Sequence, residues 1–279
     1  MTERLADISA RIDGIEQLGA VVNAMKGIAA ARSSMARTQV HAVDSYAATI
    51  AEAMARAIGN EHTPEGPDAP SGPQAMLVFC AEQGFAGAFS ERVLDSLAIK
   101  ASDRIFLIGT RGLSIAATRD ISPLWHAAMP SYSLGIPKLA DRITQAIFHD
   151  VGEGHITRLD VVFTRWKQGR AHVTRQTLFP LDLSGFAQAS GEPPLTQLPR
   201  ATLLESLGQD YFHALVSRAA LHAFAAENEA RLQAMTSAGS QIAHELETFR
   251  ATLRRVRQEA ITAEIIELGT GAASAQPTR

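Results

Sequence analysis

Apolar side chains recur at steps of three and four residues through both ends of the chain, which is the spacing of one helix face. No proline interrupts the N-terminal run, and Gly59-Asn60 and Pro64 follow it as stop signals. The pattern predicts one helix of about 55 residues, roughly 80 Å long at about 1.5 Å per residue. The apolar positions between Glu3 and Ile58 are Leu5, Ile8, Ile12, Ile15, Leu18, Val22, Met25 and Ile28, then Val43, Tyr46, Ile50, Met54 and Ile58.

Three glycines, Gly14, Gly19 and Gly27, weaken this helix, since each costs up to about 1 kcal/mol relative to alanine. An alternative role for them is to let a partner helix approach closely.

A second long helix is predicted at the other end of the chain. It begins near Thr202, where Thr202-Leu203-Leu204-Glu205 has the spacing of a capping box. Helical character resumes after Gly208 and continues to about Leu268, where Gly269 and Gly271 are expected to end it. Heptad spacing, by steps of four and three, relates Ile242, Leu246, Phe249, Leu253 and Val256.

The middle of the chain changes period. A segment rich in proline and glycine, 61–73, reads as a linker, and Gly191-Glu192-Pro193-Pro194 closes the region. Between them, strands alternate with helices, which predicts a small α/β domain with a mostly parallel sheet and an antiparallel edge. Strands are expected at 75–80, 104–108, 159–166 and 171–179, and helices at 88–100 and 137–151.

Two long apolar stripes cannot both remain in water, because each buried apolar side chain contributes roughly 1.5 to 3 kcal/mol. We therefore expect an α/β protein with long helices: an antiparallel coiled coil of the terminal helices with an inserted small Rossmann-like α/β domain. The predicted boundaries are 1–59 for the N-terminal helix, 60–73 for the linker, 74–200 for the α/β domain and 201–279 for the C-terminal helix.

Composition narrows the functional classes. Hydrophobic residues make up 46% and charged residues 20%, so a packed core is expected rather than disorder. The net charge of −3 argues against a dedicated nucleic-acid binder. One cysteine, Cys80, excludes an internal disulfide and fits a reducing compartment. No apolar run is long enough to span a membrane and the first residues lack a secretory signal, so a cytoplasmic chain is expected.

Motifs for catalysis are incomplete. The glycines of Gly84-Phe85-Ala86-Gly87 follow a predicted strand but lack the lysine of a phosphate loop. His244-Glu245 lacks the second histidine of a zinc-binding helix, and Gly112-Leu113-Ser114 lacks the last glycine of a nucleophile elbow. We expect no catalytic, cofactor-binding or metal site, and we interpret Cys80 as part of the core. The arginines at 250, 254, 255 and 257 are by default a solvated face.

The terminal helices resemble those of the gamma subunit of F-type ATP synthases. Arg11–Ile15 and Ala24–Arg32 are similar to the family's R-I-x-S-I and A-M-x-M-V-A-A-x-K segments. Arg231–Met235 and Arg257–Glu267 are similar to R-M-x-A-M and R-Q-x-x-I-T-x-E-I-x-E, at the family's spacing. Departures indicate a divergent branch: Ala81–Ala88 stands where the family has S-D-R-G-L-C-G-G.

The resemblance implies a non-catalytic central-stalk rotor that couples ion movement through a membrane ring to ATP synthesis or hydrolysis. It implies as partners the alpha and beta subunits of the hexamer, the epsilon subunit and the membrane c-ring, with no direct membrane insertion. The location implied is peripheral, at the cytoplasmic face of a bacterial inner membrane. The coupling ion is chosen in the ring, which is another chain.

By the family's pattern, the region that engages the beta-subunit catch contains Met25, Arg231, Arg257, Gln258, Thr262 and Glu264. Ordinary packing and surface charge on a helix are the alternative explanation for these residues. Two other functions stay open at this point: a coiled-coil adaptor without a rotary role, and a small α/β enzyme flanked by dimerisation helices.

Overall fold

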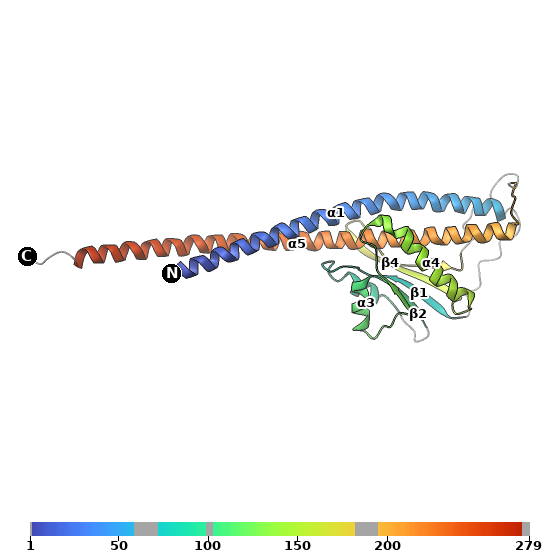
Figure 1. Ribbon diagram of the computed structural model, residues 1–279, viewed down its shortest axis with the longest axis horizontal. Helices are drawn as coiled ribbons and strands as arrows, with labels where there is room; N and C mark the ends of the chain where they lie inside the picture. Colours follow the sequence, from blue (N-terminus) through green and yellow to red (C-terminus); the bar gives the residue numbers. More distant parts are fainter. Residues whose placement is uncertain (1, 59–71, 99–102, 182–194, 275–279) are drawn as a thin grey trace, which may run out of the picture. The chain divides into compact units, whose positions relative to one another are not determined.

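Two long helices begin and end the part of the chain that the computed structural model describes, which is residues 2–58, 72–98, 103–181 and 195–274 (Figure 1). Helix α1 (Thr2–Ile58, 57 residues) confirms the predicted N-terminal helix. Helix α5 (Arg200–Ser274, 75 residues) begins close to the predicted start. Most of the predicted linker and the closing segment 191–194 lie outside the described residues.

The predicted end of α5 is wrong, because the helix continues through Gly208 and past Gly269 and Gly271 to Ser274. A glycine costs only about 1 kcal/mol inside a helix, and propagation from existing turns is cooperative. Isolated glycines between good helix formers therefore do not stop a helix that is already formed.

The chain divides into two compact units, each described here by itself. Unit 1 consists of Met1–Ile28 and Leu232–Arg279, and unit 2 is Ala29–Arg231. Unit 2 holds the whole sheet, whereas unit 1 is built from the first half of α1 and the second half of α5.

The sheet of unit 2 has five strands in the order β3-β2-β1-β4-β5. Strand β1 pairs in parallel with β2 and β4, β2 pairs in parallel with β3, and β4 pairs antiparallel with β5. The predicted strands and the antiparallel edge are confirmed; β3 was missed because three residues are too few for a periodic signal. The bounds are β1 (Gln74–Phe79), β2 (Arg104–Ile108), β3 (Trp125–Ala127), β4 (Arg158–Lys167) and β5 (Arg170–Phe179).

Three helices and a short 3-10 turn connect these strands. They are α2 (Phe89–Asp95), α3 (Thr110–Ala117), η1 (Ser133–Gly135) and α4 (Ile136–Gly152). Helix α4 confirms the prediction for 137–151, but α2 is shorter than predicted. It ends because Ser96 turns back, with its hydroxyl donating to the Val93 carbonyl oxygen at 2.6 Å, which competes with helix continuation.

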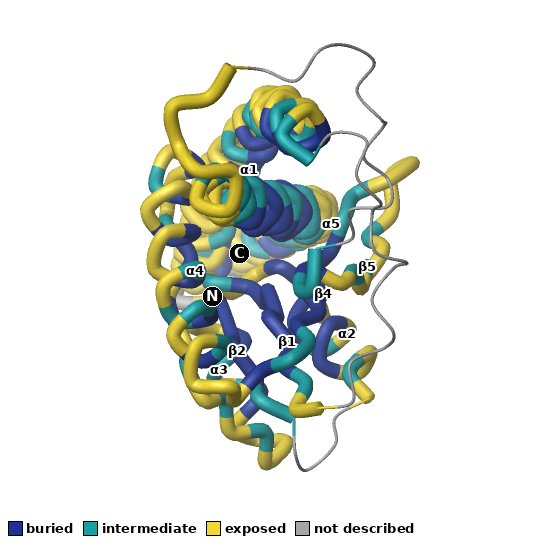
Figure 2. Tube along the Cα trace, turned by 90° about the vertical axis from the view of Figure 1, so that its right-hand side faces the viewer, coloured by how far each residue is buried: buried dark blue, intermediate teal, exposed yellow. Residues whose placement is uncertain are grey.

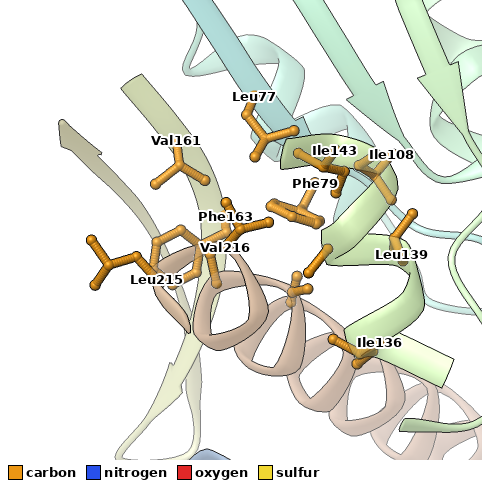
Figure 3. Close-up of a cluster of buried hydrophobic side chains, with 14 of the residues drawn as sticks. Leu77, Phe79, Ile108, Ile136, Leu139, Ile143, Val161, Phe163, Leu215 and Val216 are labelled. Atoms are coloured by element: carbon orange, nitrogen blue, oxygen red, sulfur yellow. The ribbon is translucent and has the colours of Figure 1, made fainter. Parts of the chain in front are cut away.

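Alternate residues of β1, β2 and β4 face two different helical layers, as the two-residue period of a strand requires. Leu77 and Phe79 point into the larger core with α4, α5 and part of α1, and Figure 3 draws 14 of these side chains and labels ten of them. Met76 and Val78 pack on the opposite face with α2 and α3. In Figure 2, strands β1, β2 and β4 are accordingly drawn largely in the colour of buried residues.

Unit 1 is held together by apolar contacts between α1 and α5. Ile8 and Ile12 pack with Val256 in one buried cluster. Further along, a Cβ at Gly19 would lie 3.3 Å from the Ile242 Cγ2 atom, so the backbone of α1 approaches α5 closely at this glycine. Positions rise along α1 as they fall along α5, so within unit 1 the two segments run in opposite directions.

Candidate partner-contact surface

Four of the predicted contact residues lie on one solvent-exposed part of α5. Arg257, Gln258, Thr262 and Glu264 are all exposed, and the Thr262 hydroxyl donates to the Gln258 carbonyl oxygen at 2.9 Å within the helix. We call residues 257–268 the C-terminal stretch. All four residues belong to unit 1, and no described residue covers them.

Large apolar side chains are interleaved with the polar ones on this stretch. Between 52% and 68% of each is exposed: Ile261, Ile265, Ile266 and Leu268. Soluble proteins seldom leave contiguous apolar groups in water unless another molecule covers them. Burial would contribute roughly 1.5 to 3 kcal/mol per side chain. The C-terminal stretch therefore has the composition of a protein interface, with apolar anchors beside a guanidinium, an amide and a carboxylate.

Met25 lies on α1 in unit 1 and is half-buried. Its side chain is flexible and apolar, which suits a contact that must adapt its shape.

Arg231 differs from the other predicted residues, because only 5% of it is exposed. Its Nη2 atom lies 2.5 Å from Glu227 Oε1 and donates to the Gln83 carbonyl oxygen at 3.3 Å. Nε donates to the Gly84 carbonyl oxygen at 3.2 Å, and Nη1 donates to Asn228 Oδ1 at 3.2 Å. The guanidinium is thus occupied by four acceptors from unit 2.

Glu227 completes this arrangement from the same face of α5. Its carboxylate accepts the backbone N–H groups of Glu82 at 3.1 Å and Gln83 at 3.2 Å. Glu82 in turn accepts the backbone N–H groups of Thr110 at 2.9 Å and Met129 at 2.8 Å. We call Glu227, Asn228 and Arg231 with the backbone of residues 82–84 the loop clamp. It joins α5 to the ends of three neighbouring segments of the sheet layer.

Directly after the clamped loop, Phe85 is 69% exposed and has a φ of 61°. A bulky side chain rarely adopts this left-handed backbone conformation, because its Cβ approaches the backbone. Such strain persists only where the surroundings hold it, and here the loop clamp holds the two preceding carbonyl groups. The loop clamp therefore fixes an aromatic ring in solvent.

Sequence reasoning missed Glu82, Glu227 and Asn228. The spacing of Glu227 and Arg231 is visible as an i,i+4 pair, but the same spacing is common on solvated helix faces. Only the tertiary contacts distinguish a buried clamp from a surface ion pair.

The groups considered for catalysis have ordinary structural roles. Cys80 is buried, and burial raises the pKa of its thiol to about 12, so the reactive thiolate is not available at neutral pH. The Ser114 hydroxyl donates to the Thr110 carbonyl oxygen within α3. Among the described residues, no three His, Cys, Asp or Glu side chains gather as a metal site, and no described helix has the length and apolarity needed to cross a membrane.

The whole length of the chain matches one known family. The model of the ATP synthase family matches residues 4–275, and the chain belongs to this family. The resemblance found in the terminal motifs is thereby confirmed, and the relatives are gamma chains. Over 288 residues the chain is 27% identical to the ATP synthase gamma chain of Chlorobium luteolum, covering 98% of this chain and 99% of that one. It is 28% identical over 293 residues to that of Streptomyces coelicolor, covering 95% and 93%.

Solved structures share the fold. A chain from the mitochondrial ATP synthase of Euglena gracilis, in a structure titled OSCP/F1/c-ring, superposes with a TM-score of 0.66 at 13% identity, covering 100% of this chain and 98% of that one. A chain from the rotor of the same enzyme gives a TM-score of 0.64 at 12% identity, covering 94% and 100%. At this identity the likeness concerns the helices and the five-stranded mixed sheet.

Proposed function

We propose that this chain is the central-stalk rotor subunit of a bacterial F-type ATP synthase and is itself non-catalytic. It couples ion translocation through a membrane ring to ATP synthesis or hydrolysis at a hexamer of alpha and beta subunits. The match over nearly the whole chain and the gamma-chain relatives support this function. An adaptor without a rotary role and a small α/β enzyme are not favoured by these comparisons.

We propose further that α1 and α5 form an antiparallel coiled coil into which a Rossmann-like α/β domain is inserted. The heptad positions support this architecture, since Leu246, Phe249 and Leu253 pack around the buried Ile8, Ile12 and Val256. The domain boundaries at 59, 73 and 200 belong to the same proposal. The compact units divide each long helix between them, which is compatible with a helical axle carrying a side domain.

The physical reason for such an axle is symmetry. Three identical catalytic sites stay equivalent as long as their ring is threefold symmetric. A single asymmetric chain at the centre touches each site differently, and these differential contacts set the population of open and closed states at each site. Rotation then moves the three states around the ring in sequence.

The observation that carries the contact proposal is the exposed C-terminal stretch. We propose that Arg257, Gln258, Thr262 and Glu264, with Met25 of α1, engage the catch of the beta subunit. Arg231 belongs to the same region by the family's pattern, and we propose that it acts indirectly, by holding the loop of residues 82–84. The α/β domain contacts the epsilon subunit and the c-ring, at the cytoplasmic face of the bacterial inner membrane.

Reconstitution of the alpha and beta subunits with and without this chain tests the function. We expect the chain to raise ATPase turnover, and unchanged turnover would contradict the rotor role. The double variant Gln258→Leu with Thr262→Val removes polar groups of the C-terminal stretch. It should lower the ATPase turnover of the reconstituted complex, while the helix content measured by circular dichroism stays constant.

The matched control for this double variant is Gln241→Leu with Thr248→Val. Both residues are exposed on α5 in unit 1 and lie outside the C-terminal stretch, and Thr248 has the same intrahelical hydrogen bond as Thr262. Normal turnover is expected. Equal losses in the two double variants would assign the effect to general helix packing instead.

A further inference from the structure

Three cationic side chains lie on or beside strand β4 in unit 2, and among the described residues one carboxylate pairs with any of them. Arg165 and Lys167 follow Phe163 at alternate positions of β4 and share its face, which packs against α5. Arg218 comes from α5, and the carboxylate is Asp44 of α1. We call Arg165, Lys167 and Arg218 the cation cluster.

Arg165 makes no close ion pair with any residue that the structure describes, although the charge of Asp44 acts on it from a distance. Its guanidinium carbon lies 5.1 Å from the centre of the Phe163 ring, and its Nε atom is buried without a hydrogen-bond partner. A buried donor without a partner is costly, so the Nε–H group of Arg165 is available to an acceptor from outside the chain.

Arg218 is bound only loosely. Its Nη1 atom lies 3.7 Å from Asp44 Oδ1, and its Nη2 atom donates to Gln176 Oε1 at 3.4 Å. Close hydrogen bonds between a guanidinium and a carboxylate are about 2.7 to 2.9 Å long. Asp44 thus leaves most of the hydrogen-bonding capacity of Arg218 unused.

The surroundings show the same excess of positive charge. Burial first, and then the charge of Arg218, lower the pKa of the Arg165 guanidinium from its usual value, and the charge of Asp44 offsets this only in part. His222 of α5 stacks on Phe163 with 5.9 Å between ring centres, and burial, followed by the charge of Arg165, lowers its pKa to about 4. His222 is therefore neutral at pH 7 and does not add to the charge.

We propose that the cation cluster binds a small oxyanion, a carboxylate or a phosphate, between β4, α5 and α1. Arg165 and Arg218 present planar forks of donors that match two oxygens of such a group, and Lys167 adds a point charge at the exposed rim. This inference does not depend on the rotary function.

His222 supplies a local readout for the test. With 13C-labelled histidine, its ring signal is followed by NMR during titrations with inorganic phosphate and with acetate, each at constant ionic strength maintained with chloride. The variant His222→Gln assigns the signal by its loss. A bound anion offsets the neighbouring cations, so we expect a saturable rise in the pKa of His222.

The two titrations distinguish the source of the oxyanion. Saturation by phosphate alone identifies a phosphate ligand, saturation by acetate alone a carboxylate, and saturation by both a site for either group. If the pKa of His222 does not change saturably with either anion, then neither anion binds more specifically than chloride, and the proposal is overturned.

Variants tie the response to the cluster. Arg165→Gln and Arg218→Gln should each lower the affinity for the anion by about tenfold or more. Arg165→Lys, which keeps the charge and disturbs the strand least, should bind with intermediate affinity. Arg119→Gln removes an arginine that is paired with Asp95 elsewhere in unit 2 and should leave affinity unchanged. Retention of full affinity in Arg165→Gln would refute the assignment.

Discussion

The Arg231 guanidinium donates hydrogen bonds to four acceptors inside unit 2 instead of to water. The residues that supply these acceptors would lose a buried partner if Arg231 were replaced. Glu227 is almost fully buried, so its carboxylate relies on Arg231 and on two backbone N–H groups. A buried ion pair is weak evidence for stability, but removing one partner leaves an uncompensated charge.

The variant Arg231→Met should therefore lower the free energy of unfolding by about 3 to 5 kcal/mol in urea titrations. Amide hydrogen exchange should rise at Glu82 and Gln83, the residues that Glu227 holds. Arg37→Met is the control, because the Arg37 side chain, which pairs with Glu229, is itself 53% exposed, and its loss should cost about 1 kcal/mol. Similar losses in both variants would contradict the loop clamp.

His222 makes stability depend on pH. Its folded pKa of about 4 lies below the ordinary value of 6.5, so between these values the unfolded chain binds more protons than the folded one. Its contribution is thus present above about pH 6.5 and is lost as the pH falls toward 4.

The variant His222→Gln should therefore reduce the difference in unfolding free energy between pH 7 and pH 5, measured by urea titration at both values. His244→Gln changes an exposed histidine of unit 1 and should leave that difference as it is in the parent chain. A pH dependence unaltered by His222→Gln would show that the folded ring titrates normally.

At the scale of elements, the glycines of α1 do not have a common role. Gly19 is where α1 approaches Ile242 of α5, whereas a Cβ at Gly14 would meet no atom within 4 Å. Helix propensity favours alanine at both positions by up to about 1 kcal/mol. Packing decides whether that gain is realised.

The variant Gly14→Ala should stabilise the chain by up to about 1 kcal/mol, observed as a higher midpoint of thermal unfolding. Gly19→Ala should gain less or lose stability, because its Cβ would lie 3.3 Å from the Ile242 methyl group. An equal gain at both positions would mean that α1 and α5 do not approach closely at Gly19.

On the scale of the whole molecule, the two compact units separate the sheet from the C-terminal stretch. Cys80 is the single cysteine of the chain and lies in the core of unit 2. Helix α3 packs so closely on it that a Cβ at Gly112 would lie 2.0 Å from the Cys80 Cβ atom and 2.9 Å from its sulfur. Reagents can reach this thiol only when unit 2 opens.

Labelling of Cys80 by a thiol reagent should accordingly report on unit 2 alone. Arg231→Met should accelerate labelling, because it weakens the loop that follows Cys80, while Gln258→Leu with Thr262→Val should not change the rate. The measurement is the labelling rate at constant pH and reagent concentration. Acceleration by the double variant would mean that the C-terminal stretch contributes to the stability of unit 2.

The elements themselves followed largely from local pattern. Long apolar periods predicted α1 and most of α5, and short apolar runs predicted four strands within one or two residues. The failures have local causes: β3 is too short to show a period, and the end of α5 was assigned to glycines whose cost is too small to stop a formed helix. The roles of residues 25, 231, 257, 258, 262 and 264 as partner contacts stay predictions.

The sequence by itself determined which segments are helices and strands, and its terminal motifs determined the family, because periodicity and motif spacing are properties of neighbouring residues. Only the tertiary structure decided that Arg231 is buried in the loop clamp and that Arg165 makes no close ion pair with the residues described. Both depend on residues more than 50 positions apart, such as Gln83 with Arg231 and Asp44 with Arg218. Burial and charge balance arise between distant segments, so no local pattern encodes them.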